Sequence, residues 1–187
     1  MVINEKALVK AMKAAYKGDG YVVGCQGDEL FVESAMWKVV ADLKNFPRKA
    51  LGLIAEHMGQ IPTDGMVYQI REDEAQTKIP EKGADFRGIS DDEELEEIYK
   101  TRLTYGAGNI WQMAIGGRLL WVMPENENLM QNSERAPAGA VNALASAVAG
   151  KALRIKGMVS SVTVMATEPL YQEKEILDKL SKIGFIP

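Results

Sequence analysis

Apolar and polar positions along the first third of the chain predict a helix followed by paired strands. Residues 5–17 carry an apolar stripe at helical spacing with lysines on the opposite side, and Asn4 stands at the N-cap position. Residues 21–26 and 29–33 then form two strand-like runs around Gly27-Asp28, a dipeptide typical of a tight turn. We therefore expect a helix that leads into a hairpin.

The next segment is ambiguous until its residue types are weighed. Residues 35–44 fit a helix or a strand by spacing, but Trp37 and the paired valines that follow it favour a third antiparallel strand. Pro47 then predicts the first position of a helix that ends at Gly59, with apolar residues turned inward. Residues 66–71 alternate weakly, which indicates one more strand.

The second half of the chain is organised around residues 110–123, where two apolar, aromatic-rich runs flank Gly116-Gly117. Glycine reaches the backbone angles of a two-residue turn without a Cβ clash, so the sequence predicts a β-hairpin here. Because both arms are nearly continuously apolar, we expect them to be central strands covered on both faces.

Four more elements are predicted around this hairpin. Ser90 and the acids after it fit a capping box that opens a helix over residues 91–100. Residues 138–149 are apolar almost all round, which indicates a buried helix. Residues 153–167 form a long strand-rich run, and residues 169–183 are patterned as a final amphipathic helix.

The two halves share a similar order of elements. Aligning Gly27-Asp28 with Gly116-Gly117 places a proline about twenty residues after each turn, which suggests a helix-hairpin-helix-strand unit used twice. The alternative is a single α+β domain. The sequence thus predicts an α+β protein with a mainly antiparallel sheet built from hairpins and packed helices. Residues 1–72 and 90–187 would form its two units, separate or sharing one core, with an acidic loop or linker at 73–89.

Composition limits the class of protein. Hydrophobic residues make up 47% and charged residues 26% of the 187, values typical of globular proteins. No apolar run approaches the roughly 20 residues that span a bilayer, and the first residues lack a signal-peptide pattern, so we expect a cytoplasmic protein without a membrane partner. A single cysteine, Cys25, excludes an internal disulfide and a zinc-cysteine cluster.

The net charge of −4 conceals an acidic segment. Residues 72–97 contain eleven acids against three bases, so the rest of the chain carries a net positive charge. One interpretation is a solvated connector that runs into the first turns of a helix. The other is an acidic arm that covers a mildly basic surface or imitates nucleic acid there.

Catalytic and cofactor motifs are missing from the sequence. With one histidine, His57, it has no Ser/His/Asp set, and Cys25 has no neighbour that would activate it. Gly106-Ala107-Gly108 lacks the residues that complete a phosphate loop. We expect no cofactor and no metal. A small enzyme that uses carboxylates is one alternative function, because Asp28, Glu29 or Glu33 could meet another acid across a sheet.

A binding or assembly protein accounts for more of the pattern. Three tryptophans lie in or next to the predicted hairpins, and tryptophan is enriched where protein interfaces are strongest. The candidate binding residues are Trp37, Trp111, Arg118 and Trp121. Since the apolar hairpin and the apolar 138–149 segment exceed what one small core covers, we expect a non-catalytic protein that acts as a homo-oligomer.

A nucleic-acid accessory protein with an acidic covering segment is the other alternative. The order of helix, three-strand meander, helix and strand is similar to that of DNA sliding-clamp domains, a similarity of topology with no shared motif behind it. The lysines at positions 6, 10, 13 and 17 would form one basic helix face, but no basic stripe interleaves with aromatic residues.

Overall fold

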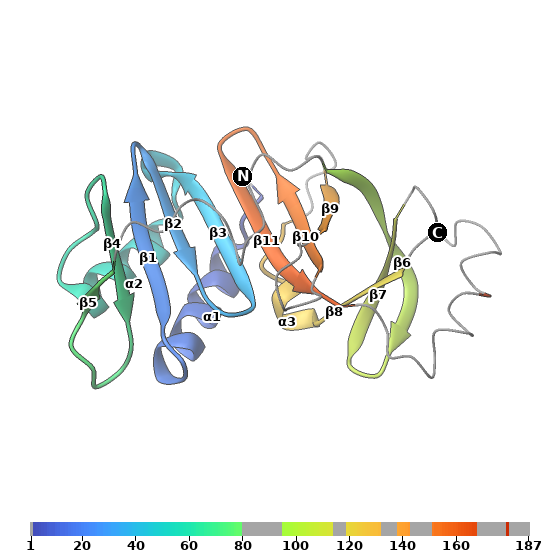
Figure 1. The fold of residues 1–187 in the computed structure, drawn as a ribbon, viewed down its shortest axis with the longest axis horizontal. Coiled ribbons are helices and arrows are strands. Elements are labelled where there is room, and N and C mark those ends of the chain that lie inside the picture. Colours follow the sequence, from blue (N-terminus) through green and yellow to red (C-terminus); the bar gives the residue numbers. More distant parts are fainter. Residues whose placement is uncertain are drawn as a thin grey trace.

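The computed structural model describes residues 2–79, 95–113, 119–131, 138–142, 151–167 and 179. Its strands join edge to edge in the order β5-β4-β1-β2-β3-β11-β10-β9-β6-β7-β8, and every pairing between named strands is antiparallel. Figure 1 shows that this sheet runs the length of the molecule, with the first half of the chain at one end and the second half at the other. The α+β class predicted from the sequence is therefore correct.

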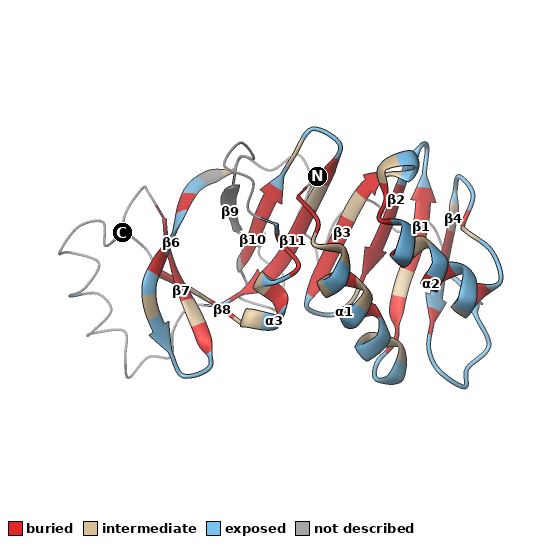
Figure 2. Ribbon diagram, turned by 180° about the vertical axis from the view of Figure 1, so that it is seen from behind, coloured by how far each residue is buried: buried red, intermediate tan, exposed pale blue. Residues whose placement is uncertain are grey.

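The first half of the chain is a sheet with two helices on one face (Figure 2). Its elements are α1 (Glu5–Lys17), β1 (Tyr21–Gln26), β2 (Glu29–Glu33), β3 (Trp37–Asp42), the short 3-10 helix η1 (Leu43–Asn45), α2 (Arg48–Met58), β4 (Met66–Ile70) and β5 (Thr77–Lys78). The Asn4 side chain accepts a hydrogen bond from the Ala7 N–H, as an N-cap does, and Gly59 ends α2 with a left-handed φ of 80°. The helices α1 and α2 and the strands β1 to β4 overlap the elements predicted from their patterns. The short strand β5, which pairs with β4, was not predicted, because it lies within residues 73–89, where the sequence indicated a loop.

The second half is made mainly of strands. It contains β6 (Glu96–Tyr105), β7 (Gly108–Met113), β8 (Leu119–Val122), the one-turn helix α3 (Pro124–Glu127), β9 (Ala138–Asn142), β10 (Lys151–Lys156) and β11 (Ser160–Ala166). β8 pairs with β7, and a bridge between Trp121 and Thr167 brings it back to the chain just after β11. This end of the sheet therefore curls round on itself (Figure 1).

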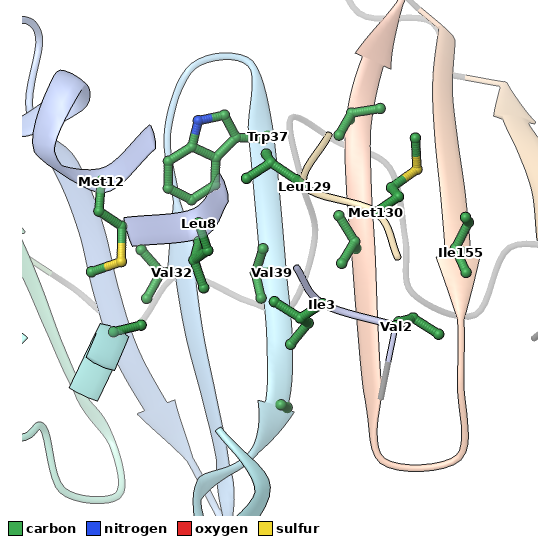
Figure 3. Close-up of a cluster of buried hydrophobic side chains, with 14 of the residues drawn as sticks. Val2, Ile3, Leu8, Met12, Val32, Trp37, Val39, Leu129, Met130 and Ile155 are labelled. Carbon is green, nitrogen blue, oxygen red and sulfur yellow. The ribbon is translucent and has the colours of Figure 1, made fainter. Parts of the chain in front are cut away.

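Strands β3 and β11 form the seam between the halves. Their register pairs Val39 with Val162, and the helix-facing row continues through Val32 and Val23 on one side and Ile155 on the other. Every member of that row is buried, and Leu8 and Met12 of α1 pack over it in one cluster (Figure 3). The hydrophobic core is thus continuous across the seam.

The chain start strengthens this junction. Ile3 forms a bridge with Met130, and the Asn4 N–H donates to the Leu129 carbonyl at 2.9 Å. Val2 and Ile3 are both fully buried beside the seam (Figure 3). Residues 2–4 and residues 129–130, far apart in the sequence, therefore cover the same part of the core.

The opposite face of the sheet carries a buried polar row across the same seam. Glu33, Lys38, Thr163 and Arg154 stand side by side in the register, and all are at least 95% buried. Arg154 Nε donates to Thr163 Oγ1 at 2.9 Å, and the Lys38 ammonium lies 5.2 Å from the centre of the Phe31 ring. At the seam, the face of the sheet towards the helices is therefore apolar, and the opposite face carries this row of buried polar side chains.

Two helices predicted for the second half are wrong. Residues 96–100, expected to end a helix, begin β6, and residues 138–142, expected to begin another, form β9 between β10 and β6. Pairing with neighbouring strands outweighs the helix preference of these alanines and glutamates. The turn at Gly116-Gly117 lies outside the described residues, as does most of the predicted helix at 169–183. The duplication stays a prediction.

Among the described residues, no helix combines the length and the apolar character needed to span a bilayer. The acidic segment 72–97 is described only at its two ends, and its interpretation as a covering arm stays a prediction.

Candidate functional site

An apolar groove of about 630 Å³ lies where the two halves meet. One wall is α1, another is the turn between β2 and β3, and the third is the start of α3. The residues that line it are Ala7, Lys10, Ala11, Ala14, Ala15, Ser34, Met36, Trp37, Met123, Pro124, Glu125, Asn126 and Asn128. Mainly apolar lining with a few polar groups is the usual composition of a ligand or peptide site.

The α1 wall is formed by alanines at helical spacing. Ala7, Ala11 and Ala14 follow one another at intervals of four and three, so their methyl groups share one side of the helix. Longer side chains at these positions would fill the space beside the helix. The groove is therefore open because of small residues, while Leu8 and Met12 fix the same helix to the core.

The second wall places two large side chains at the start of β3. Trp37 is 4% exposed and packs in the core cluster (Figure 3), whereas Met36 before it is 42% exposed. The Met36 carbonyl accepts a hydrogen bond from the Met165 N–H at 2.9 Å, which holds its backbone against β11. Met36 therefore lines the groove with its backbone held in place and its side chain partly exposed. A methionine side chain is flexible and can adapt its shape to different partners.

The third wall is tied to the beginning of the chain. Pro124 occupies the first turn of α3, where its missing N–H costs nothing, and the Met123 carbonyl accepts hydrogen bonds from the N–H groups of Asn126 and Glu127. Directly after α3, Leu129 and Met130 bind the chain segment that leads into α1. The segment that enters α1 and the segment that follows α3 are consequently joined by backbone hydrogen bonds beside the groove.

The predicted binding residues separate in the structure. Trp37 lines the groove. Trp111 and Trp121 lie on adjacent strands but on opposite faces, because Trp111 pairs with Leu120 and Trp121 with Ile110. Arg118 lies outside the described residues. Of the three candidate binding residues that the structure describes, Trp37 alone lines the groove.

Trp111 instead takes part in a polar cluster centred on Glu127 of α3. The Glu127 carboxylate accepts hydrogen bonds from Asn109 Nδ2 at 2.6 Å and Trp111 Nε1 at 3.5 Å, and it forms an ion pair with Lys100. The Glu127 side chain is only 12% exposed. This cluster joins α3 to β6 and β7, and so supports the third wall of the groove from behind.

The single histidine lies in a separate hollow of about 400 Å³ beside α1 and α2. The rings of His57 and Tyr16 are stacked 3.7 Å apart, and His57 Nδ1 shares a hydrogen bond of 3.0 Å with the Tyr21 hydroxyl. Burial lowers the pKa of His57, which favours the neutral imidazole, and burial also raises the pKa of Tyr21. The structure thus places the single histidine in an aromatic stack with a hydrogen-bonded tyrosine beside it.

Cys25 does not have the surroundings of a nucleophile. Its thiol is buried and donates to the Gly27 carbonyl at 3.4 Å. Burial, together with the nearby carboxylates of Asp64 and Asp28, raises the pKa of this thiol. A raised pKa keeps sulfur protonated, which is the reverse of what activates a catalytic cysteine.

The sequence placed Ala7, Ala11 and Ala15 in the apolar stripe of α1, and it did not identify Ala14, Met123 or Pro124 as wall residues. The alanine spacing was visible, but an alanine at a helix position is compatible with a packed face and with an open groove. A packed face and an open groove differ in the distance from the helix to the neighbouring wall. That distance is set by strand pairings between residues that are far apart in the sequence. No local signal could have provided it.

The fold and the groove define an α+β protein with an apolar recess at the junction of its halves. In the part of the chain that the structure describes, no three histidine, cysteine or acidic side chains are grouped as metal ligands would be. The sequence matches no known family model, and a search of curated proteins finds no match.

Proposed function

We propose that this chain is a non-catalytic binding or assembly protein whose groove receives an apolar element of another protein molecule, and that it acts as a homo-oligomer. The observation that carries this proposal is the groove itself: about 630 Å³, walled by alanines, Met36, Trp37 and Met123. Exposed apolar recesses of this kind are costly to leave in water and commonly mark interaction sites.

The polar groups of the groove support binding in preference to catalysis. Lys10 and Glu125 are its ionisable lining residues, and both are exposed at the rim. General acid–base chemistry depends on titratable groups held close together with altered pKa values. A recess with an apolar floor and a charged rim instead resembles the centre and border of a protein interface.

Introducing a charge into the groove tests this function. Ala14 is exposed on α1, so Ala14→Glu keeps the helix and places a carboxylate against the apolar walls. We expect sedimentation velocity of the wild type to show an oligomer that dissociates on dilution, and Ala14→Glu to weaken it at least tenfold. Ala55→Glu makes the same change on exposed α2, outside the groove, and should assemble as the wild type does. A monomeric wild type at every concentration would overturn the homo-oligomer.

A second candidate function is binding of nucleic acid. It is favoured by the two helices, which carry six basic residues against two acidic ones, with the basic side chains all exposed. Such a layer attracts a phosphate backbone. The basic residues are Lys6, Lys10, Lys13, Lys17, Arg48 and Lys49.

Salt dependence separates this candidate from the first. Fluorescence anisotropy with a labelled DNA duplex should show affinity that falls steeply with salt, and Lys6→Gln/Lys17→Gln should reduce the slope by about 2. Lys78→Gln/Lys156→Gln removes two exposed charges outside these helices; it is the matched control and should leave the slope unchanged. No binding at low salt would exclude nucleic acid as the partner.

A further inference from the structure

The turn between β10 and β11 presents a methionine entirely to solvent. Met158 has a relative exposure of 103%, higher than any other large hydrophobic residue that the structure describes. Val159 beside it is 37% exposed, and Leu43, in the 3-10 helix that follows β3, is 38% exposed. We call these three residues the apolar tip. Covering a large apolar side chain that is fully hydrated lowers the free energy, so Met158 favours any contact that buries it.

The apolar tip is held in place by backbone hydrogen bonds. The Gly157 N–H donates to the Ser160 carbonyl at 2.8 Å, and the Asp42 N–H donates to the Val159 carbonyl at 3.2 Å. Ser160 is in turn fixed through its hydroxyl, which accepts from the Val2 N–H at 3.3 Å. Because the turn is fixed before any contact is made, little backbone entropy would be lost when Met158 binds.

The tip and the groove lie at opposite ends of the same two strands. Ser160 pairs with Ala41 at the tip end of β3, whereas Val164 pairs with Trp37 at the groove end. Figures 1 and 2 show the β10–β11 turn at one end of these strands and α3 at the other. From Met158 at the tip to Val164 beside Trp37 the strand advances six residues, which at about 3.3 Å per residue is roughly 20 Å. A chain therefore cannot place its tip in its own groove.

We infer that the groove receives the apolar tip of a second copy of this chain, with Met158 as the side chain that enters it. This inference rests on the proposed function and names its partner. A cavity of about 150 Å³ accommodates benzene, so a groove of about 630 Å³ has room for Met158 and the adjoining Val159. Methionine suits such a recess because its unbranched side chain adapts to irregular walls.

The charges at the two surfaces are compatible. Exposed Lys44 and Lys156 and half-buried Asp42 lie within two positions of tip residues in the sequence, while exposed Lys10 and Glu125 line the groove. A lysine beside the tip can face Glu125 and Asp42 can face Lys10, so opposite charges can meet around the contact and set its orientation. Rim pairs of this kind contribute more to specificity than to affinity.

A tip that binds a groove at the other end of the next molecule makes a head-to-tail contact. Such an interface uses two different surfaces of the chain, and it closes into a ring or continues as a filament. In either form each subunit uses both its tip and its groove. The two surfaces can consequently be disabled separately.

The test uses two variants alone and mixed, analysed by native mass spectrometry and sedimentation velocity. Met158→Glu disables the tip and Ala14→Glu disables the groove, and each alone should shift the mass to that of the 20.6 kDa monomer. Mixed in equal amounts, they should form a one-to-one dimer, because the first keeps an intact groove and the second an intact tip. Met158→Leu keeps an apolar tip and should assemble like the wild type.

The outcomes distinguish this inference from the function on which it rests. Because Met158 is fully exposed, Met158→Glu should fold normally. Its thermal midpoint should equal that of the wild type at a dilution at which both proteins are monomeric. A wild-type oligomer that Met158→Glu leaves intact, or a mixture that stays monomeric, overturns the tip-to-groove contact but leaves the assembly function standing. A wild type that never assembles overturns both.

Discussion

The indole of Trp121 lies directly against the backbone of Gly108 on the neighbouring strand, where a Cβ atom would overlap the ring. From this position the Trp121 Nε1–H donates to the Tyr105 carbonyl at 2.9 Å. Gly108 is buried, and its missing side chain is what allows the indole to cover the β6–β7 turn. Glycine is required here by close approach, not by a positive φ angle.

Gly108→Ala should therefore destabilise the protein by about 1–3 kcal/mol, as overpacking commonly does, because Trp121 must move and lose its hydrogen bond. Urea unfolding followed by tryptophan fluorescence measures the change. Gly52→Ala is the control: Gly52 is exposed inside α2 with open space around it, so the substitution should stabilise by about 0.5–1 kcal/mol. Equal effects of the two substitutions would contradict the packing described for Trp121.

Removing the Glu127 carboxylate should weaken the support behind the groove. Glu127→Ala leaves buried Trp111 Nε1 and half-buried Asn109 Nδ2 without this acceptor, and we expect a loss of about 1–3 kcal/mol in unfolding free energy. Glu127→Gln retains an acceptor oxygen and should lose less. Urea titrations of the three proteins give the comparison, and an alanine variant as stable as the wild type would show that the cluster contributes nothing.

A substitution in the buried polar row that keeps the shape of the side chain should still lower the free energy of unfolding. Thr163→Val keeps the volume of the side chain but removes the hydroxyl that accepts from Arg154 Nε, and should destabilise by about 1–3 kcal/mol. Thr77→Val makes the same change on exposed β5 and should stay within about 0.5 kcal/mol of the wild type. Guanidinium chloride unfolding distinguishes the two, and similar effects would rule out a special role for the Arg154–Thr163 bond.

His57 predicts how stability depends on pH. Burial lowers its pKa in the folded protein, with Glu56 and Glu72 acting in the opposite direction and Lys13 adding to the decrease. The unfolded state therefore binds a proton more readily, so the stabilisation is complete above the unfolded pKa of about 6.5 and is lost as pH falls through the lower folded value.

The measurement is the unfolding free energy of wild type and His57→Phe from pH 8 to pH 5. Phenylalanine can keep the stack on Tyr16 but cannot take up a proton. We expect the variant to show a smaller decrease in stability towards acidic pH than the wild type. Identical pH profiles would mean that His57 does not contribute to this dependence.

Most of the first half of the fold could be predicted because its signals are local. The stripe of α1, the turn at Gly27-Asp28 and the proline before α2 each act within a few residues, and the structure places elements where they indicate. Trp37 favoured a strand over a helix in an ambiguous segment, and β3 begins at this residue. Local propensity and tertiary packing agree for these elements.

In the second half, tertiary pairing overrides the local preference. Residues 138–142 contain alanine and glycine without a polar face, which indicated a buried helix, yet they pair with both β10 and β6. Residues 96–100 followed a capping-box pattern, but Ile98 is buried between exposed Glu97 and Tyr99, which is the alternation of a strand. The groove escaped prediction for a related reason, since its walls come from three separate segments.

The seam between β3 and β11 has a consequence for how this chain is made. Ser160 pairs with Ala41, more than a hundred positions earlier, so a ribosome would release the first half of the sheet well before its partner strand emerges. During that interval the nascent chain would present β3 as an open edge able to recruit strands from other molecules. Contacts this distant in sequence also slow folding. The yield of native protein should therefore depend on chaperones and on the rate of translation.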